Sequence, residues 1–450
     1  MTNDGSGATA REYRIGPKSA WAGAWKVSAA VGAVGAAIAL YGYKTDPTRF
    51  AFSYLFGYLV SLSLALGSLF FIMVLYVTKA SWGVTVRRVA EFFVRPMGVL
   101  VILLLPLIAM VPRLFPWAGA RHGAESGAVV AAEKAPAPLA ESRGFAEREP
   151  AALRDLPVPD PKRLELAEEK ADAAIVAHKR FYLNPVFFFV RLFLYCAVWS
   201  WLAYRYFNWS SEQDGAGGVA NTAAAQRFAP IGLMLFAVTI TFFAFDWLLS
   251  LDATWYSTIF GVYFFAQCAL FQMAALILMA LLLRRSGLLG DAINIEHFHD
   301  MGKLLFGWIA FWSYIAFAQF FLTWYSNIPD EVSWFHKRWH DNEGSWMGVS
   351  LALVIFHFFV PFWFLMSRNI KRRLPFLAAG AAWMVFMHVV DLYWIVMPNY
   401  GPLAPNVVDL GCLLGIFGTY LAFVLRSMTE YSLVPVGDPR LTRALDFENA

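Results

Sequence analysis

Three ionisable side chains lie deep inside long apolar stretches of the sequence, and their types and spacing are those of proton carriers. His357 lies in one stretch, and His388 and Asp391 lie three residues apart in the next, hence on one helix face. At about 1.5 Å per residue, His357 would lie about 16 Å and His388 about 14 Å below the same membrane surface. Histidine titrates near neutral pH, and a buried aspartate can alternate between charged and neutral forms. Chains of such groups are typical of proton relays.

The relay would begin at the inner end of the apolar stretch 301–325, which is long enough to cross a hydrocarbon core of about 30 Å. His299 and Lys303 lie at this inner mouth. We therefore predict a proton relay through five residues: Lys303, His299, His357, His388 and Asp391. Each buried histidine could instead only bond a neighbouring carbonyl, and that packing role stays open.

A haem is a further alternative for the two buried histidines. His357 and His388 differ in expected depth by only about 3 Å, so together they could bind one b-type haem. Adjacent antiparallel helices leave little room for a macrocycle, which favours the relay.

A second set of polar residues lies towards the outer face. Asp246 lies about three-quarters of the way across its apolar stretch, Asp252 follows in the outer loop, and Arg191 lies two turns into the preceding stretch. Arg191 either extends to the surface or pairs with Asp246 on the adjacent helix, which would make both charges tolerable in lipid. We predict a proton or quinone contact at Asp246, Asp252 and Arg191.

Composition predicts an all-α membrane protein with about ten spans. Of 450 residues, 59% are hydrophobic and 15% are charged, against about 25% charged in soluble domains. The three cysteines are far apart, and no CxxC pair exists, so we predict no metal site and no iron–sulfur cluster in this chain. The expected spans are 21–43, 50–78, 96–116, 185–207, 228–250, 257–283, 301–325, 346–367, 375–397 and 407–428.

The basic residues predict that both termini lie in the cytoplasm. Eighteen Lys and Arg residues flank the spans on the side of the termini, against four on the opposite side: Lys44, Arg49, Lys337 and Arg338. The net charge of +4 therefore indicates topology and not nucleic-acid binding.

The segments outside the spans divide the chain further. Residues 1–20 and 429–450 are expected as cytoplasmic tails, and the spans fill 21–116 and 185–428. The loop 117–184 is expected in the periplasm, with a first part that is extended or wrapped over a neighbour and a surface helix over 163–180. In the first span, Ser28, Gly32 and Ala36 form a face of small residues, which could contact a partner subunit or another helix of this chain.

Two sequence patterns resemble a known family. Residues 245–265 (FDWLLSLDATWYSTIFGVYFF) and 299–331 (HDMGKLLFGWIAFWSYIAFAQFFLTWYSNIPDE) resemble the NrfD-like, polysulfide-reductase-type membrane subunits. The likeness extends over spans two to ten and is greatest to the ActF-type subunit of alternative complex III. It implies two four-helix bundles, spans 2–5 and 6–9, flanked by spans 1 and 10.

The resemblance also implies a function and partners. The chain would be a subunit of a quinol:cytochrome c, or other periplasmic acceptor, oxidoreductase in the bacterial inner membrane. It would bind no cofactor itself, and contact with quinone stays open. Iron–sulfur clusters and haem c would be on periplasmic partner subunits, with a homologous ten-span subunit beside it. Asp246 and Asp252 match the region of the family's quinol site. Two alternatives from other classes are a structural membrane anchor without chemistry and a secondary transporter.

Overall fold

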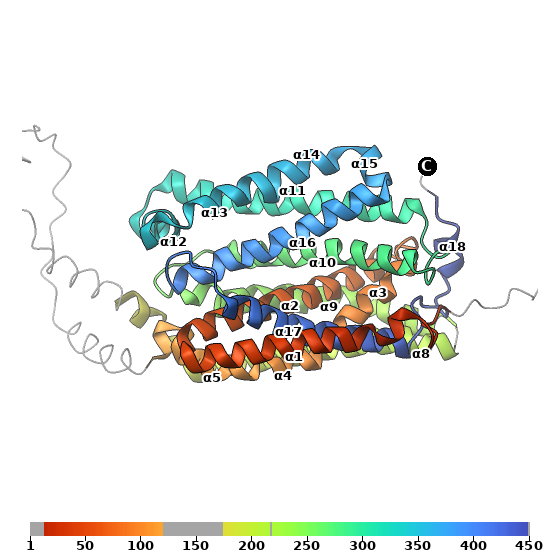
Figure 1. Ribbon diagram of the computed structural model, residues 1–450, viewed down its shortest axis with the longest axis horizontal. Helices are drawn as coiled ribbons and strands as arrows, with labels where there is room; N and C mark the ends of the chain where they lie inside the picture. Colours follow the sequence, from red (N-terminus) through yellow and green to blue (C-terminus); the bar gives the residue numbers. More distant parts are fainter. Residues whose placement is uncertain (1–12, 120–173, 217, 449–450) are drawn as a thin grey trace, which may run out of the picture.

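The computed structural model describes residues 13–119, 174–216 and 218–448, and these residues are helical without strands. Nine of their helices are long and apolar enough to cross a membrane. A tenth span is a bent pair, Val84–Leu103 and Leu105–Leu114, with an angle of 56° between its halves. The expected all-α, ten-span architecture is confirmed, and the helices lie side by side along one direction (Figure 1).

The helices follow in chain order, with the eighth span divided between α13, the π-helix η7 and α14. Their bounds are α1 (Ala24–Thr45), α2 (Pro47–Val77), α3 (Val84–Val94), α4 (Met97–Leu103), α5 (Leu105–Leu114), α8 (Pro185–Ala216), α9 (Ala220–Trp247), α10 (Phe260–Arg285), α11 (Ile295–Ser326), α12 (Pro329–Trp339), α13 (Met347–Ala352), η7 (Leu353–Phe359), α14 (Val360–Met366), α15 (Arg368–Arg372), α16 (Leu374–Val396), α17 (Val407–Glu430) and α18 (Leu441–Leu445).

Two four-helix bundles share a central contact between α2 and α10. The first bundle contains α2, α3–α5, α8 and α9, and the second contains α10, α11, the divided eighth span and α16. At their crossing, a Cβ on Gly67 would lie 2.1 Å from the carbonyl oxygen of Cys268, so only glycine lets the two backbones approach this closely. Helices α1 and α17 pack together and lie against α2, as the flanking spans were expected to do.

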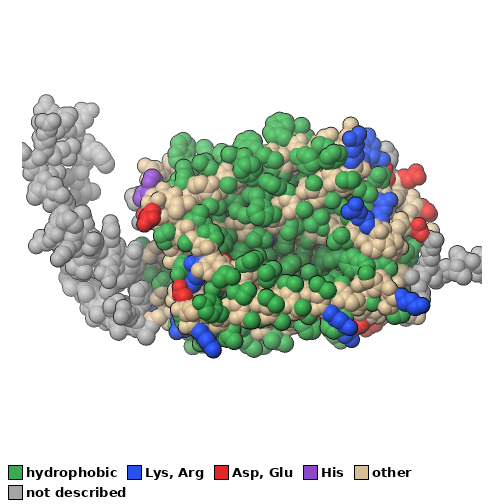
Figure 2. Space-filling view, viewed as in Figure 1, with side chains coloured by type: hydrophobic (Ala, Val, Ile, Leu, Met, Phe, Trp, Pro, Cys, Tyr) green, Lys and Arg blue, Asp and Glu red, His purple; other side chains and the backbone are tan. Residues whose placement is uncertain are grey.

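Charged side chains mark the two ends of this assembly. Figure 2 shows hydrophobic side chains over the middle of one face, and Lys, Arg, Asp and Glu towards its two ends. Both ends of the described chain lie on one side, because the amide of Leu433 donates to the carbonyl of Tyr13 (2.7 Å). We call this the terminal side and the other the opposite side.

The third span begins earlier than predicted. Residues 84–94 form the buried helix α3, although Arg87, Arg88 and Glu91 made this segment look like a loop. Arg87 and Arg88 each pair with Glu91 at 2.9 Å, and the three side chains are at most 1% exposed. Mutual neutralisation within one helical turn lets a charged segment be buried, and hydropathy alone cannot reveal that.

The small-residue face of α1 contacts this chain's own α17. Ser28 donates to the carbonyl of Gly418 (2.8 Å), and a Cβ on Gly35 would lie 2.2 Å from the amide nitrogen of Gly415. The sequence left two contacts open for this face, a partner subunit or another helix of this chain, and the structure shows the second.

Gly35→Ala should destabilise the protein by about 1–3 kcal/mol, because its methyl group would meet backbone that cannot rotate aside. The matched control is Gly98→Ala on α4, where a Cβ meets nothing within 4 Å. Thermal unfolding in detergent should show a lower midpoint for Gly35→Ala than for wild type, and an unchanged midpoint for Gly98→Ala. Equal midpoints would contradict the close α1–α17 contact.

The chain after α17 packs across the terminal side instead of extending away as a tail. Asp438 accepts from Arg87 (2.8 Å) and Arg440 (2.9 Å), and the carbonyl of Phe447 accepts from Asn294 (2.7 Å). This segment therefore connects α3 of the first bundle with the start of α11 in the second. The predicted helix 163–180 lies mostly outside the described residues, of which 174–178 are helical.

The attachment of this segment should weaken in acid. Burial alone would raise the pKa of Asp438, but the hydrogen bond from Arg440 and the charges of Arg87 and Arg440 overcome this and hold the pKa at about 2. A carboxyl whose pKa is depressed on folding stabilises the protein above its unfolded pKa of about 3.9, and this contribution of about 2 kcal/mol is lost as the pH falls towards 2.

The difference in unfolding free energy between wild type and Asp438→Asn should therefore be near 2 kcal/mol at pH 7 and shrink steadily below about pH 4. Denaturant titrations in detergent at a series of pH values measure it. A difference that stays constant down to pH 2.5 would show that the ionised carboxylate is not what stabilises the attachment.

Candidate functional site

The second bundle surrounds one buried carboxylate. Asp391 on α16 is 0% exposed, and it accepts three hydrogen bonds: from the hydroxyl of Tyr263 (2.9 Å), the amide of Gln267 (2.6 Å) and the indole of Trp312 (2.9 Å). Tyr263 and Gln267 lie one turn apart on α10, and Trp312 lies on α11. Three helices thus position donors around a single acid.

His357 is the fourth neighbour of this acid. Its Nδ1 lies 3.8 Å from Oδ2 of Asp391, and its ring stacks on Trp312 with centroids 3.9 Å apart and planes at 7°. Neither ring nitrogen has a hydrogen-bond partner among the described protein atoms. The structure therefore brings together two of the five residues of the predicted relay, and the imidazole nitrogens remain available.

A local change of helix type directs His357 into the bundle. Residues 353–359 form a π-helix, and Pro361 follows. Proline has no N–H, so it cannot donate to the carbonyl of His357 four residues earlier, and the helix widens. The indole of Trp383 on α16 donates to the carbonyl of Phe356 (2.7 Å), which supplies this widened turn with a donor from the neighbouring helix.

His388 is buried one turn from Asp391 but contacts another helix. Its Nε2 lies 2.8 Å from the hydroxyl of Ser63 on α2, and its ring stacks on Phe271 of α10 with centroids 4.3 Å apart. No hydrogen bond between described residues joins His388 to His357 or Asp391. A haem iron would need one ring nitrogen from each histidine, and Ser63 already occupies Nε2 of His388.

The residues predicted at the inner mouth lie at the start of α11, away from this acid. Lys303 pairs with Asp300 and is half exposed, whereas His299 is 7% exposed. Nine residues separate Lys303 from Trp312, a distance of about 14 Å along the helix. Close by, Lys371 donates to the carbonyls of Leu365 and Met366, and burial together with the charge of Lys303 lowers its pKa.

Arg338, which the sequence placed among outer-loop charges, is instead fully buried on α12. It donates to the carbonyls of Trp334 (2.8 Å) and Ile395 (3.0 Å), and its guanidinium stacks on the ring of Trp334 at 3.4 Å. Its Nε has no described partner. Burial lowers the pKa of Arg338 to about 9, against the opposing charge of Asp252, so the cation persists at neutral pH. Ile395 follows Asp391 by one helical turn on α16. Arg338 therefore lies about one turn from Asp391, in the direction of the opposite side.

In the first bundle, the structure confirms one of two expected placements for Arg191. It donates to both oxygens of Asp246 (2.7 and 2.8 Å), and Tyr195 donates to the same carboxylate (2.7 Å). The guanidinium also lies 3.9 Å from the ring centre of Tyr182. This bidentate pair is buried and saturated, which satisfies both charges within the membrane.

Asp252 lies apart from this pair at the opposite side. It forms an ion pair with Lys337 (2.7 Å) and lines a cavity of about 240 Å³. Tyr182, which stacks under Arg191, and Phe245, which precedes Asp246, line the same cavity. The predicted outer contact thus comprises a buried ion pair and a surface acid, and Asp252 together with neighbours of that pair lines one cavity.

The remaining features concern metals and relatives. Within the described ranges, no three His, Cys, Asp or Glu side chains are arranged to hold a metal ion. Comparison with protein-family models and with curated proteins finds no match to this chain. What the site can do chemically therefore follows from its geometry: a sealed carboxylate beside an unpaired imidazole can accept and release a proton within a membrane bundle.

Proposed function

We propose that this chain is an integral membrane subunit of a respiratory quinol oxidoreductase, and that its second bundle carries protons across the bacterial inner membrane. One observation carries the proposal: the adjacency of Asp391 and His357 in the sealed interior of that bundle. The patterns at 245–265 and 299–331 supply the respiratory context, with the terminal side as the cytoplasm.

The pair can hold one proton in two ways. A carboxylate offers about four acceptor positions, and Tyr263, Gln267 and Trp312 occupy three of those on Asp391. The remaining position is on Oδ1, whereas Oδ2, which accepts from Gln267 and Trp312, is the oxygen nearest to Nδ1 of His357 (3.8 Å). One shared proton gives either a neutral acid beside a neutral ring or an ion pair, so the charge of the pair does not change while the proton moves between them.

Other unpaired polar atoms support a path from this pair towards the terminal side. The oxygen of Gln267, the amide nitrogen of Gln272 and Nδ1 of His388 are all buried without partners among the described protein atoms. Buried polar atoms of this kind are commonly bridged by internal water. We propose that water links them with His299 and Lys303, in a path that includes all five residues of the predicted relay.

The buried cation of Arg338 favours loss of a proton from Asp391. A positive charge stabilises the ionised form of nearby acids, so it promotes proton release. By Coulomb's law at an effective dielectric constant of about 20, two unit charges on the order of 8 Å apart interact by about 2 kcal/mol.

Arg338→Met should therefore slow proton release on the order of tenfold, measured with a pH dye on the opposite side of reconstituted vesicles. Arg338→Lys is the matched control, because it keeps the charge while losing the planar hydrogen bonds to Trp334 and Ile395. Equal slowing in both variants would assign Arg338 a structural role in attaching α12.

Asp246, Asp252 and Arg191 would form a quinone or proton contact on the periplasmic side. The cavity of about 240 Å³ beside them is mostly apolar, which suits a quinone ring. The partner subunits would carry the iron–sulfur clusters and haem c that accept the electrons.

Purification from native membranes in mild detergent tests the whole proposal. We expect a complex that contains iron–sulfur clusters, cytochrome c and a second ten-span subunit, and that releases protons into vesicles when quinol is supplied. A chain that purifies alone and transports a solute would instead establish a secondary transporter, and assembly without any effect of buried-acid variants would establish an anchor.

A further inference from the structure

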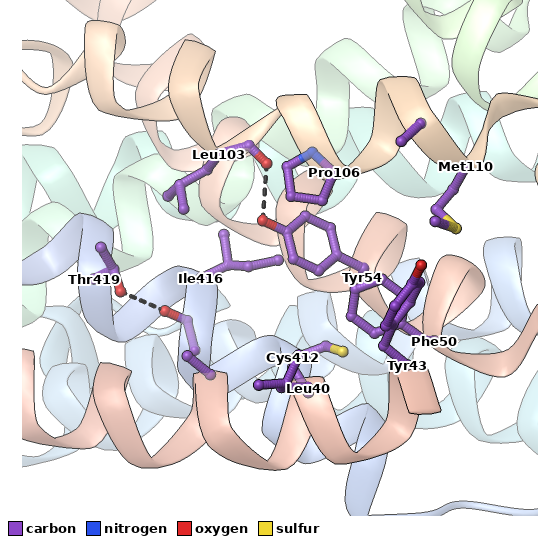
Figure 3. Close-up of a pocket in the computed structure, with 14 residues that line it drawn as sticks. Leu40, Tyr43, Phe50, Tyr54, Leu103, Pro106, Met110, Cys412, Ile416 and Thr419 are labelled. Carbon is purple, nitrogen blue, oxygen red and sulfur yellow. Dashed lines mark hydrogen bonds between the residues drawn. The ribbon is translucent and has the colours of Figure 1, made fainter. Parts of the chain in front are cut away.

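A cavity on the flank of the first bundle lies away from both sites discussed above. It has a volume of about 410 Å³ and lies between α1, α2, α17 and the bent third span (Figure 3). Ala36 and Leu40 on one wall and Ala109 on the other are exposed, so the cavity opens on the membrane-facing surface. It extends from Tyr43, next to the opposite side, to Ala36, a depth of about 10 Å along α1.

The bend that forms the cavity is built into the chain. Pro106 has no N–H and cannot donate to the carbonyl of Ile102, so the third span breaks between α4 and α5 with an angle of 56°. The hydroxyl of Tyr54 on α2 donates to the carbonyl of Leu103 at this break (2.9 Å), as Figure 3 shows. This hydrogen bond joins α2 to the residue next to the carbonyl that Pro106 leaves without its helical donor, and it keeps the bend in position.

The walls favour a hydrocarbon over a quinone ring. The hydroxyl of Tyr54 already donates to Leu103, and that of Thr419 donates to the carbonyl of Gly415 (2.6 Å). Neither hydroxyl proton is available to a quinone carbonyl. Tyr43, next to the opposite side, adds one further hydroxyl to the lining. The remaining lining side chains come mainly from alanine, leucine, isoleucine, proline and phenylalanine, which recognise only apolar surface.

A cation lies at the rim. Arg113 is exposed, and its Nη1 lies 3.5 Å from Sδ of Met110, which lines the cavity. A guanidinium with free donors matches the geometry of a phosphate group. Arg113 lies near the end of α5 that faces the opposite side. Lipid headgroups of the leaflet on that side lie at this level.

We propose that this cavity binds one acyl chain of a phospholipid from the leaflet on the opposite side, with the lipid phosphate held by Arg113. Bound lipid would fill the space that the bend creates between α1, α17 and α5, and would thereby stabilise the attachment of the two flanking spans. This inference is independent of the proton path.

Three variants test this proposal. Each is purified from membranes in its native assembly state. Ala109→Phe and Ala36→Phe fill the cavity from opposite walls, and Arg113→Gln removes the rim charge. Ala37→Phe is the matched control, because Ala37 is equally exposed on α1 but does not line the cavity. Phospholipid of defined composition is titrated and bound molecules are counted by native mass spectrometry.

Wild type and Ala37→Phe should retain one phospholipid more than either filling variant, and Arg113→Gln should weaken its binding at least tenfold. Thermal unfolding checks that each variant is folded. Equal lipid counts in wild type and both filling variants would overturn the proposal. So would retention of an isoprenoid quinone in that position, or a cavity filled by a partner's helix in the purified complex.

Discussion

Replacing Asp391 by asparagine should abolish proton movement through the second bundle while the protein still folds and assembles. Asparagine keeps the size of the side chain and an acceptor oxygen for Tyr263 or Trp312. It cannot bind and release a proton near neutral pH, so the path loses its central carrier. Loss of a positioned proton carrier typically lowers a rate by two orders of magnitude or more, and we expect a decrease on the order of 100-fold.

The measurement is quinol-driven proton release in vesicles, normalised to the amount of assembled complex. His357→Phe should have a similar effect, because it removes the unpaired imidazole 3.8 Å from the acid and keeps an aromatic ring against Trp312. His388→Phe should lower proton movement less, because Ser63 already holds its Nε2 (2.8 Å).

A second buried acid provides the control. Asp409 on α17 accepts from Arg49 (2.8 Å), Ser53 (2.6 Å) and Tyr393 (2.9 Å), outside the proposed path. Asp409→Asn should lower stability without changing protons released per electron. If Asp391→Asn assembles normally and retains full proton release, Asp391 has only a packing role.

The depth of the polar residues could be predicted from the sequence, but their neighbours could not. His357, His388 and Asp391 stand out because each interrupts an apolar run of span length. That Asp391 and His357 become neighbours, whereas His388 contacts α2, depends on how α16 is rotated and on the widened turn before Pro361. Periodicity does not report either feature.

The misassigned cations have a common physical cause. Arg338 and Arg87 lie in segments whose local hydropathy is low, so charge counting places them in loops. Besides a neighbour within one turn, each has a partner from a distant part of the chain: Ile395 for the first and Asp438 for the second. By contrast, the pairing of Arg191 with Asp246 was an available prediction, since two costly charges at similar depth on consecutive spans stabilise each other.

Removing Asp246 alone should destabilise the protein by about 3–5 kcal/mol, because Arg191 would remain as an uncompensated charge in the first bundle. Arg191→Met combined with Asp246→Leu removes both charges, and Tyr195→Phe removes the hydroxyl that would lose its acceptor. Apolar replacement of a whole buried ion pair is often neutral or stabilising, so this triple variant should regain most of the lost stability. Unfolding in detergent compares the single and triple variants.

Turnover of the triple variant then separates a structural pair from a functional one. If Asp246 and Arg191 contact quinone or a proton, as we propose, the stable triple variant should still oxidise quinol at least tenfold more slowly than wild type, because it lacks both charges and the hydroxyl of Tyr195. Asp409→Leu is the comparison, since it breaks another buried Arg–Asp pair and should lower stability while activity per folded protein is kept. Wild-type turnover in the triple variant would mean that the pair only joins α8 to α9, and that quinol is oxidised elsewhere in the complex.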